Sequence, residues 1–321
     1  MPLAYDPEYA KALEPLPILA PHPTPKVHDV ETRRRQLDSN VEASLGPVPV
    51  PSNVSIDTLK VPSYDQAEIT VLRVYPKKAA EASPTTSAAF IHVHGGGFIS
   101  GSAQTFVKAT ALTASATQLQ FFTVDYRKAP EHPHPTPAED VYAALKWVQD
   151  NAAQFGVDPA RIGITGESSG GGIAASVAIM ARDRKLSPPL AKQVLVYPML
   201  DDRTLSPVKG VEELAVWKCA DNVTGWTALL GDQAGKADTS PYAAAARVAS
   251  VEGLPPLYID VGELDMFREE AMEYALRFVK ASISTEFHLY PGLPHGWEAF
   301  APFISATQRA IGNRHRALTS I

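Results

Sequence analysis

The sequence has only one cysteine, Cys219, so an internal disulfide is impossible and a reducing compartment is expected. No other cysteine or histidine lies near it at a metal-binding spacing, so we interpret Cys219 as a small packed apolar residue. The sequence also has no apolar run long enough to span a bilayer. Its first residues, MPLAYDPEYAKALEPLP, carry acids and prolines where a signal peptide has a basic start and an apolar middle. These absences predict a soluble, cytoplasmic protein without a membrane span.

Basic residues are fewer than acidic ones: 29 lysines and arginines stand against 35 aspartates and glutamates, which gives a net charge of −6. A nucleic-acid partner usually leaves a basic footprint, so we expect none. The 321 residues are 45% hydrophobic and 20% charged, an ordinary globular composition that needs no disulfide or metal to stabilise its core. We predict a single domain over residues 1–321.

Short apolar runs rich in β-forming residues alternate with helical patterns from Asn53 onward. Strands buried on both faces and separated by helices are typical of a mostly parallel sheet with helices on each side. We therefore predict an α/β fold with an eight-stranded, mostly parallel sheet whose first two strands pair antiparallel. The eight runs are VSIDTLKV (54–61), ITVLRVY (69–75), AAFIHVH (88–94), QFFTVDY (120–126), RIGITG (161–166), AKQVLVYP (191–198), PPLYIDVG (255–262) and STEFHLYP (284–291).

The intervening helices show apolar residues at helical spacing. One pattern runs along a single face from Val141 through Leu145, Val148 and Ala152 to Phe155. Another follows Met266, where Ala271, Tyr274, Ala275 and Phe278 repeat the spacing. Near the N-terminus, the proline-rich stretch at 13–25 predicts an extended connector, and residues 27–45 have helical composition.

Two stretches do not fit the alternation of strands and helices. One is the N-terminal segment 1–50, and the other is the insertion 200–238, which includes VEELAVWKCADNVTGWTALLGD. A helical insertion there would lie over the carboxyl ends of the strands, where open α/β sheets bind ligands. We therefore predict that both segments form a helical cap. Trp217 and Trp226 in the insertion could line an acyl pocket or pack the cap onto the sheet.

The pentapeptide GESSG, from Gly166 to Gly170, matches the pattern G-x-S-x-G between a predicted strand and a predicted helix. In that context Ser168 sits on a tight turn that exposes its hydroxyl at the top of the sheet, and the glycines permit close backbone approach. The pattern alone is also compatible with a glycine-rich helix start or a phosphate-binding turn. The strand–turn–helix context favours a nucleophile.

A second glycine-rich segment, His94-Gly95-Gly96-Gly97, directly follows an earlier strand. Backbone N–H groups of consecutive glycines, together with the N–H of Ser169, can stabilise the negative oxygen of a tetrahedral intermediate. A flexible turn is the plainer interpretation. Its position upstream of the nucleophile turn favours the catalytic one.

A serine nucleophile needs a base, and the base needs an orienting carboxylate. Three acids lie in or just after the predicted strand 255–262: Asp260, Glu263 and Asp265. Asp260 belongs to the strand and is interpreted as structural. Asp265 lies in the following loop, where it could instead cap the next helix, and we expect that one side chain does not easily fill both roles. Glu263 is the alternative acid. His295, in the loop after the last strand, is the single histidine in a suitable place downstream.

Together the segments HGGGF, DYRKAPEHPHPTPAEDVYAALKWV, GESSGGG, SPY (240–242), GELDMFREE and PGLPHGW resemble the hormone-sensitive-lipase family of α/β hydrolases. The resemblance runs from about Leu72 to Trp297, with the motifs in the family's order. It implies a cap-bearing α/β-hydrolase fold and a serine carboxylesterase acting on short- to medium-chain esters, with a small-molecule ester as partner and no cofactor. Relatives often dimerise, so a homodimer is compatible with the resemblance, although no residue here indicates one.

Carried over residue by residue, the resemblance makes Ser168 the nucleophile, Asp265 the acid and His295 the base. The backbone N–H groups of Gly96, Gly97 and Ser169 would form the oxyanion hole. His94 would shape the glycine loop, supported by Gly95, with Gly166 and Gly170 supporting the nucleophile turn.

The sequence departs from the family pattern at two sites beside the nucleophile. Ser169 replaces the usual alanine, and its added hydroxyl needs a partner; Glu167 replaces the usual aspartate. A third departure, Met266-Phe267 after Asp265, also leaves the three catalytic residues in place.

Other functions remain open at this point. The pairs His92/His94 and His132/His134 could be metal ligands, but no third ligand is spaced to complete either, so we expect no metal. A non-catalytic receptor could use the same fold, although the presence of Ser168, Asp265 and His295 counts against it. An amidase or lactonase would use the same three residues.

Overall fold

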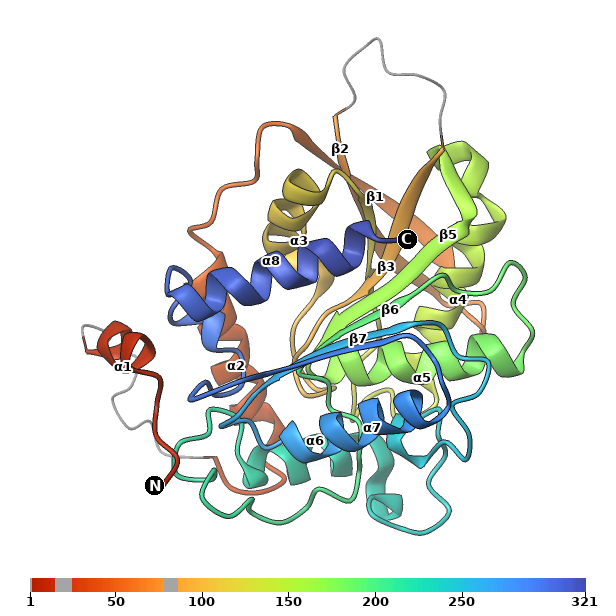
Figure 1. Ribbon diagram of the computed structural model, residues 1–321. Coiled ribbons are helices and arrows are strands. Elements are labelled where there is room, and N and C mark those ends of the chain that lie inside the picture. Colours follow the sequence, from red (N-terminus) through yellow and green to blue (C-terminus); the bar gives the residue numbers. More distant parts are fainter. Residues whose placement is uncertain (1, 15–24, 78–85) are drawn as a thin grey trace.

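The computed structural model describes residues 2–14, 25–77 and 86–321 (Figure 1). Within these ranges the chain forms eight strands and eight α-helices. The strands are β1 (Val54–Pro62), β2 (Glu68–Pro76), β3 (Ser87–Val93), β4 (Gln120–Asp125), β5 (Val157–Glu167), β6 (Gln193–Val196), β7 (Leu257–Gly262) and β8 (Thr285–Tyr290). The helices are α1 (Pro7–Leu13), α2 (Val30–Leu45), α3 (Ala103–Thr117), α4 (Thr136–Asp150), α5 (Ser169–Asp183), α6 (Cys219–Leu230), α7 (Arg268–Lys280) and α8 (Ser305–Thr319).

All eight strands join one sheet in the order β1-β2-β4-β3-β5-β6-β7-β8. Strand β2 pairs antiparallel with both β1 and β4, and every other neighbouring pair is parallel. The prediction of an eight-stranded, mostly parallel sheet that begins with an antiparallel pair is thus confirmed. The parallel strands direct their carboxyl ends to one edge, so the segments that follow β3, β5, β7 and β8 can meet there.

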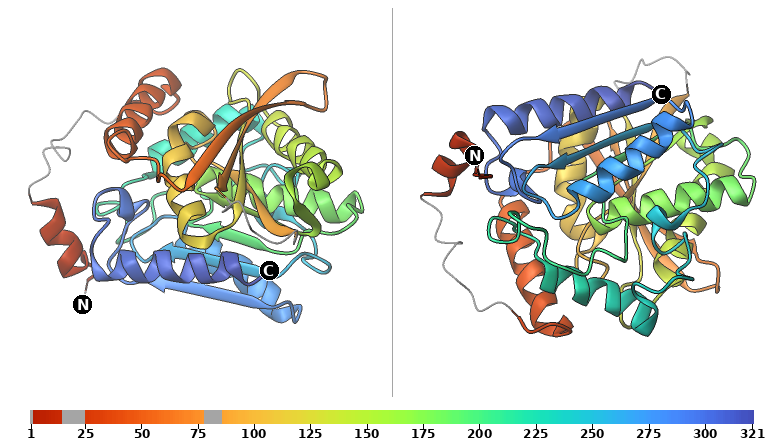
Figure 2. Two further views of the ribbon diagram at one scale, coloured as in Figure 1. Left: turned by 90° about the horizontal axis from the view of Figure 1, so that it is seen from above. Right: turned by 60° about the horizontal axis from the view of Figure 1, so that its bottom comes forward.

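Helices cover both faces of the sheet (Figures 1 and 2). Helices α3 and α8 pack on one face, where Phe90, Phe121 and Tyr258 belong to a buried cluster with α3 residues such as Val107. Helices α4, α5 and α7 lie on the other face over a larger cluster that includes Ile91. The strands that carry the candidate site are therefore held between two apolar layers.

Helix α4 is shorter than the apolar pattern predicts. It ends at Asp150, and Ala152–Phe155 form a separate 3-10 turn. Asn151 leaves helical geometry, and its side-chain amide donates to the carbonyl of Trp147 at 2.8 Å. Such a local side-chain bond competes with continuation of the helix. Ala152 is still buried, so the apolar face predicted from the sequence extends past the end of the helix.

The N-terminal segment lies against the rest of the molecule at two places. Near α1, the N–H of Asp6 donates to the carbonyl of Gly292 at 2.9 Å, just after β8. Helix α2 contacts α6 (Figure 2). Between these helices, Arg33 Nε lies 2.7 Å from Asp221 Oδ1. Most of the predicted proline-rich connector lies outside the described residues. Helix α6 occupies the 200–238 insertion, between β6 and β7.

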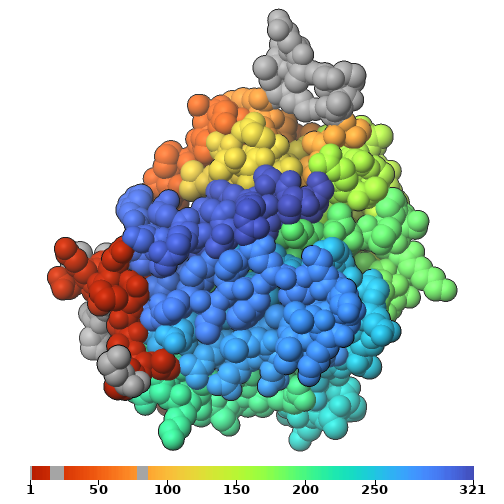
Figure 3. Space-filling model, viewed as in Figure 1, coloured from red at the N-terminus to blue at the C-terminus, as the bar shows by residue number. Residues whose placement is uncertain are grey.

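The C-terminal elements form much of one side of the molecular surface. Figure 3 shows α7, β8 and α8 exposed together on this side, with α1 at its margin. No helix in the described ranges combines the length and the apolar character needed to cross a membrane.

Candidate active site

Ser168 stands at the tight turn between β5 and α5, with a backbone φ of 57° and ψ of −125°. A non-glycine residue rarely adopts a positive φ, so this turn is strained. The flanking glycines allow it. A Cβ on Gly166 would lie 2.5 Å from the carbonyl oxygen of Gly170, and one on Gly170 would lie 2.1 Å from that of Val93. Any larger residue at either position would push α5 away from the sheet.

The structure brings Ser168, His295 and Asp265 together in one line of hydrogen bonds. His295 Nε2 lies 2.9 Å from Ser168 Oγ, and His295 Nδ1 lies 2.6 Å from Asp265 Oδ2. The carboxylate accepts at Nδ1, so the proton belongs there and Nε2 is free to accept from the serine. Asp265 is fully buried, whereas Ser168 and His295 keep 8% and 9% exposure. A substrate can therefore reach the serine and the imidazole but not the acid.

Asp265 accepts two hydrogen bonds, one on each carboxylate oxygen. While Oδ2 accepts from His295, Oδ1 accepts the backbone N–H of Phe267 at 2.9 Å, directly before α7. The cap role is not filled: α7 begins at Arg268 with Phe267 as its N-cap residue and no side-chain cap, so the bond to Phe267 only fixes the loop before the helix. The expectation that one side chain does not easily fill both roles agrees with this arrangement. Glu263, the alternative acid, accepts the N–H of Gly292 instead.

Asp260 pairs with a residue that the sequence did not single out. Arg314, on α8, donates to both of its carboxylate oxygens, at 2.7 and 3.0 Å. The same guanidinium contacts Glu298, which accepts from the hydroxyl of Tyr197 at 3.1 Å. Burial raises the pKa of Tyr197 well above its usual value, so its hydroxyl stays protonated and donates. A buried carboxylate in an apolar strand signals that a cation must lie nearby, but not which one.

Aromatic rings enclose the imidazole of His295. Tyr197 and Phe267 meet it edge to face, with ring centroids 4.6 and 5.2 Å away. Such contacts restrict rotation of the ring. The Asp260–Arg314–Glu298 network therefore supports His295 through Tyr197.

The glycine loop after β3 lies directly against the turn that carries Ser168. A Cβ on Gly95 would be 3.3 Å from Cβ of Ser168. Gly96 and Gly97 have positive φ values of 125° and 60°, which turn successive N–H groups away from the strand direction. In the described chain, no acceptor pairs with the backbone N–H of Gly96, Gly97 or Ser169. Unpaired N–H groups beside a serine hydroxyl can bind a negative oxygen.

His94 is buried beneath this loop and does not face the serine. Its Nδ1 donates to the carbonyl of Gly95 at 2.7 Å, and its ring stacks between Phe106 and Tyr126. Burial lowers the pKa of His94 to about 3, with a smaller effect from Lys128. The imidazole is therefore neutral at physiological pH and acts as a structural donor.

Glu167 and Ser169, the two departures beside Ser168, have different surroundings. Glu167 accepts the N–H of Gly95 at 3.3 Å and lies 3.0 Å from His92 Nε2, so it ties the nucleophile strand to the glycine loop. The hydroxyl of Ser169, in contrast, is buried and forms no hydrogen bond of good geometry in the described chain. Its polar neighbour is the hydroxyl of Tyr126, which itself donates to the carbonyl of His94.

The 200–238 insertion contacts the glycine loop from above. The indole of Trp217 lies so close to Gly97 that a Cβ there would be 2.4 Å from a ring carbon. Trp217 Nε1 donates to Asn222 at 3.1 Å, which fixes the ring. Trp226 is completely buried against Phe98, so it packs the insertion onto the loop. Trp217 is thus the tryptophan that borders the site.

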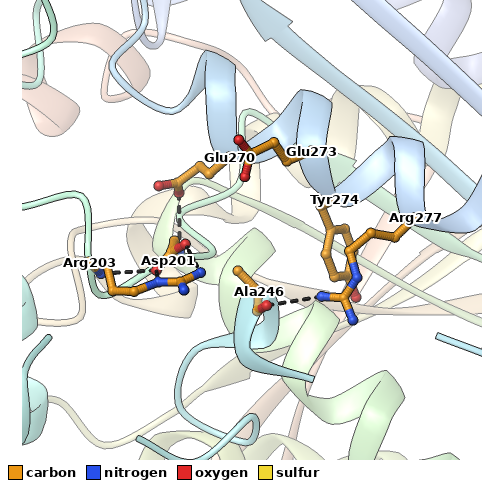
Figure 4. A pocket seen from close by; sticks show the side chains of 7 residues that line it. All are labelled: Asp201, Arg203, Ala246, Glu270, Glu273, Tyr274 and Arg277. Carbon is orange, nitrogen blue, oxygen red and sulfur yellow. Dashed lines mark hydrogen bonds and ion pairs between the residues drawn. The ribbon is translucent and has the colours of Figure 1, made fainter. Parts of the chain in front are cut away.

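A small cavity lies away from the serine, beside the first residues of the 200–238 insertion (Figure 4). Its volume is about 30 Å³, room for about one water molecule and not for an ester. Glu270 is buried there and accepts from the N–H of Leu200 and the hydroxyl of Thr204, while burial raises its pKa. The lining residues are Asp201, Arg203, Ala246, Glu270, Glu273, Tyr274 and Arg277.

No group of three or more histidine, cysteine, aspartate or glutamate side chains is placed to hold a metal ion within residues 2–14, 25–77 and 86–321. The His92 ring contacts Glu167 and Thr123. The backbone N–H of His134 donates to the carbonyl of Leu229 at 3.0 Å, which joins this loop to α6. The arrangement supports acyl transfer by a serine.

Comparisons with known proteins agree with this geometry. A family model described as alpha/beta hydrolase fold matches residues 90–299. Carboxylesterase NlhH of Mycobacterium tuberculosis is 34% identical over 259 residues, covering 79% of each chain. Esterase LipI of the same species is 34% identical over 232 residues, covering 68% of each. Among solved structures, a bacterial heroin esterase aligns over 98% of this chain and 97% of its own, with 33% identity and a TM-score of 0.86.

Proposed function

The chain belongs to the alpha/beta hydrolase family and is a carboxylesterase; we propose that Ser168, His295 and Asp265 carry out its reaction. The resemblance to the hormone-sensitive-lipase family is thereby confirmed. One observation carries the proposal: a single imidazole lies within hydrogen-bond distance of both a strained serine and a buried carboxylate.

The first half of the reaction forms an acyl-enzyme. His295 Nε2 takes the proton of Ser168 as Oγ attacks the ester carbonyl carbon, and the carbonyl oxygen becomes an oxyanion. The N–H groups of Gly96, Gly97 and Ser169 donate to that oxygen. Collapse of the intermediate breaks the bond to the alkoxy oxygen, which leaves as the alcohol with the proton from His295.

The second half releases the acid and restores the serine. Water loses a proton to His295 Nε2 and attacks the acyl carbon, which forms a second oxyanion in the same place. Collapse breaks the bond to Ser168 Oγ, which takes the proton back. Asp265 stabilises the charged imidazole during both halves and remains ionised. No cofactor takes part in this scheme.

The substrate range that we propose is short- to medium-chain carboxylic esters. Residues 1–50 and 200–238 would act as the cap that sets this range. In support, the Trp217 ring from the insertion borders Gly97 and narrows the space above the loop.

The test is hydrolysis of a chain-length series of p-nitrophenyl esters by wild type and Ser168→Ala. We expect turnover that peaks at a short or medium chain and falls by several orders of magnitude in the variant. Retained activity in folded Ser168→Ala would show that another group is the nucleophile. Matched amide and lactone substrates test the amidase and lactonase alternatives, and absence of turnover on every ester would favour the receptor.

Two further properties stay predictions from the sequence. One is a cytoplasmic location, which cell fractionation tests. The other is a homodimer, which light scattering on the purified chain tests.

A further inference from the structure

The glycine loop is a closed turn. The carbonyl of Gly96 accepts the N–H groups of Ile99 and Ser100, at 3.1 and 2.9 Å, and the Ser100 hydroxyl at 3.1 Å. Gly101 closes the loop, since a Cβ there would be 2.9 Å from the carbonyl oxygen of Gly95. The direction of the Gly96 and Gly97 N–H groups therefore depends on how residues 99–101 are held.

Two side chains from α2 hold this turn from outside. Arg34 Nε donates to the carbonyl of Ile99 at 2.5 Å, and Asp38 Oδ1 accepts the N–H of Gly101 at 2.8 Å. Arg34 Nη2 also donates to the carbonyl of Ala129 at 3.0 Å, and the N–H of Ala129 in turn donates to Phe98. Arg34 and Asp38, four residues apart on one face of α2, thus bind a carbonyl and an N–H of the same glycine loop.

The helix that carries these residues is itself fixed. The guanidinium of Arg34 is held by Glu131, with contacts of 2.8 and 2.7 Å to its two carboxylate oxygens. The preceding residue, Arg33, is buried and pairs with Asp221 on α6 at 2.7 Å. At the other end of α2, Lys108 of α3 donates to the carbonyl of Gly46. The helix can therefore act as a rigid brace.

We propose that Arg34 and Asp38 are positioning residues, which set the oxyanion-binding N–H groups through Ile99 and Gly101. This inference rests on the proposed serine mechanism. The N-terminal segment then contributes to the chemical step as well as to the choice of substrate. Both steps of the reaction pass through an oxyanion, so a loosened loop lowers kcat whichever step limits the rate.

The experiment compares Arg34→Gln and Asp38→Ala with the matched control Arg35→Gln. Arg35 neighbours Arg34 on α2 but is mostly exposed, and among the described residues its polar contacts are only with Glu31 and Thr32 of its own helix. We expect kcat to fall about tenfold in both test variants, less than the 10²–10³-fold loss when a donor is removed outright. We expect KM to stay within about twofold of wild type, the loss to be equal across acyl chain lengths, and the control to match wild type.

A conservative variant and an inhibitor separate positioning from general damage. Asp38→Asn keeps an oxygen that can accept the N–H of Gly101, so its kcat should return close to wild type. An alkyl trifluoromethyl ketone, which forms an oxyanion on the serine, should bind Arg34→Gln and Asp38→Ala about tenfold more weakly. The unfluorinated ketone should bind all variants alike.

Two outcomes overturn the inference. One is an unchanged kcat in Arg34→Gln and Asp38→Ala, and the other is a changed KM or chain-length preference at unchanged kcat, which would place α2 in substrate binding. Should Arg34→Gln fail to fold, Asp38→Ala against Asp38→Asn decides alone. Activity that persists in Ser168→Ala is a separate result, because it overturns the proposed function and not the contact of α2 with the loop.

Discussion

His295 Nδ1 lies 2.6 Å from Asp265 Oδ2, and the other oxygen of that carboxylate accepts the backbone N–H of Phe267. The second contact prevents rotation of the carboxylate about its terminal bond. The imidazole is therefore held in one orientation and one tautomer, with Nε2 directed at Ser168. The conformation of the loop before α7 and the orientation of the base therefore depend on the same side chain.

Asp265→Asn should lower kcat by about 10³–10⁴-fold, because an amide can donate to Nδ1 and so favour the wrong tautomer. Glu263→Gln should change kcat by less than about threefold, since its amide oxygen can still accept from Gly292. Steady-state hydrolysis of p-nitrophenyl butyrate measures both. The reverse ranking would identify Glu263 as the acid.

The buried, neutral state of His94 should make the protein less stable in acid. Its pKa is about 3 in the folded chain against 6.5 unfolded. Between these values only the unfolded chain binds the proton, so this contribution is present above pH 6.5 and declines as the pH falls toward 3. From pH 7 to pH 5 the loss should be about 2 kcal/mol. Urea unfolding at the two pH values measures it.

The control for this prediction is His94→Phe, which keeps a stacked ring but cannot titrate. It should be less stable than wild type at pH 7 because it loses the hydrogen bond to Gly95. Its stability should nevertheless fall by about 2 kcal/mol less than that of wild type between pH 7 and pH 5. Equal pH dependence in the two proteins would contradict the assignment of a neutral, buried imidazole.

Arg314→Leu should lower the free energy of unfolding by about 3–5 kcal/mol, because it leaves Asp260 buried without its cation. The double variant Arg314→Leu/Asp260→Asn removes that charge as well and should recover part of the loss. Chemical denaturation of the two single variants and the double variant gives the coupling energy. Additive effects would show that the pair does not interact in the folded protein.

Ser169→Ala should raise stability by about 1–2 kcal/mol, because it removes a buried hydroxyl that forms no hydrogen bond of good geometry in the described chain. Hydrolysis should be unchanged, since residue 169 acts through its backbone N–H. Ser176→Ala on the same helix is the matched control: its hydroxyl donates to the carbonyl of Pro241, so it should destabilise. Guanidinium unfolding compares them, and a stability loss in Ser169→Ala would mean that its hydroxyl is paired.

The nucleophile turn could be predicted from sequence because its requirements are local. A strand, two close glycines and a helix start within a few residues are visible in the chain itself, and so is the succession of strands and helices. The end of α4 was missed for an equally local reason, the bond from the Asn151 side chain to Trp147. Periodicity records which face is buried and does not detect such a bond.

The contacts around the site could not be predicted, because they join residues distant in the chain. Arg314 and Asp260 are 54 residues apart, and Arg34 and Ile99 are 65 apart. Only the placement of α8 and α2 creates these pairs. The second contact of Asp265 could not be predicted because it depends on where the loop places the N–H of Phe267. Sequence identifies the reacting groups better than the groups that support them.

Helices α5 and α2 differ in burial, and we expect them to differ in local stability as well. Every residue from Ser169 to Ala181 is buried, whereas α2 has a largely exposed side. Amide protons in α5 should therefore exchange with solvent only on global opening, and those in α2 through smaller, more frequent openings. On gentle heating, α2 should therefore open at a lower temperature than the turn that carries Ser168. The glycine loop would then lose the contacts of Arg34 and Asp38. Loss of activity would then precede loss of the fold and would reverse on cooling.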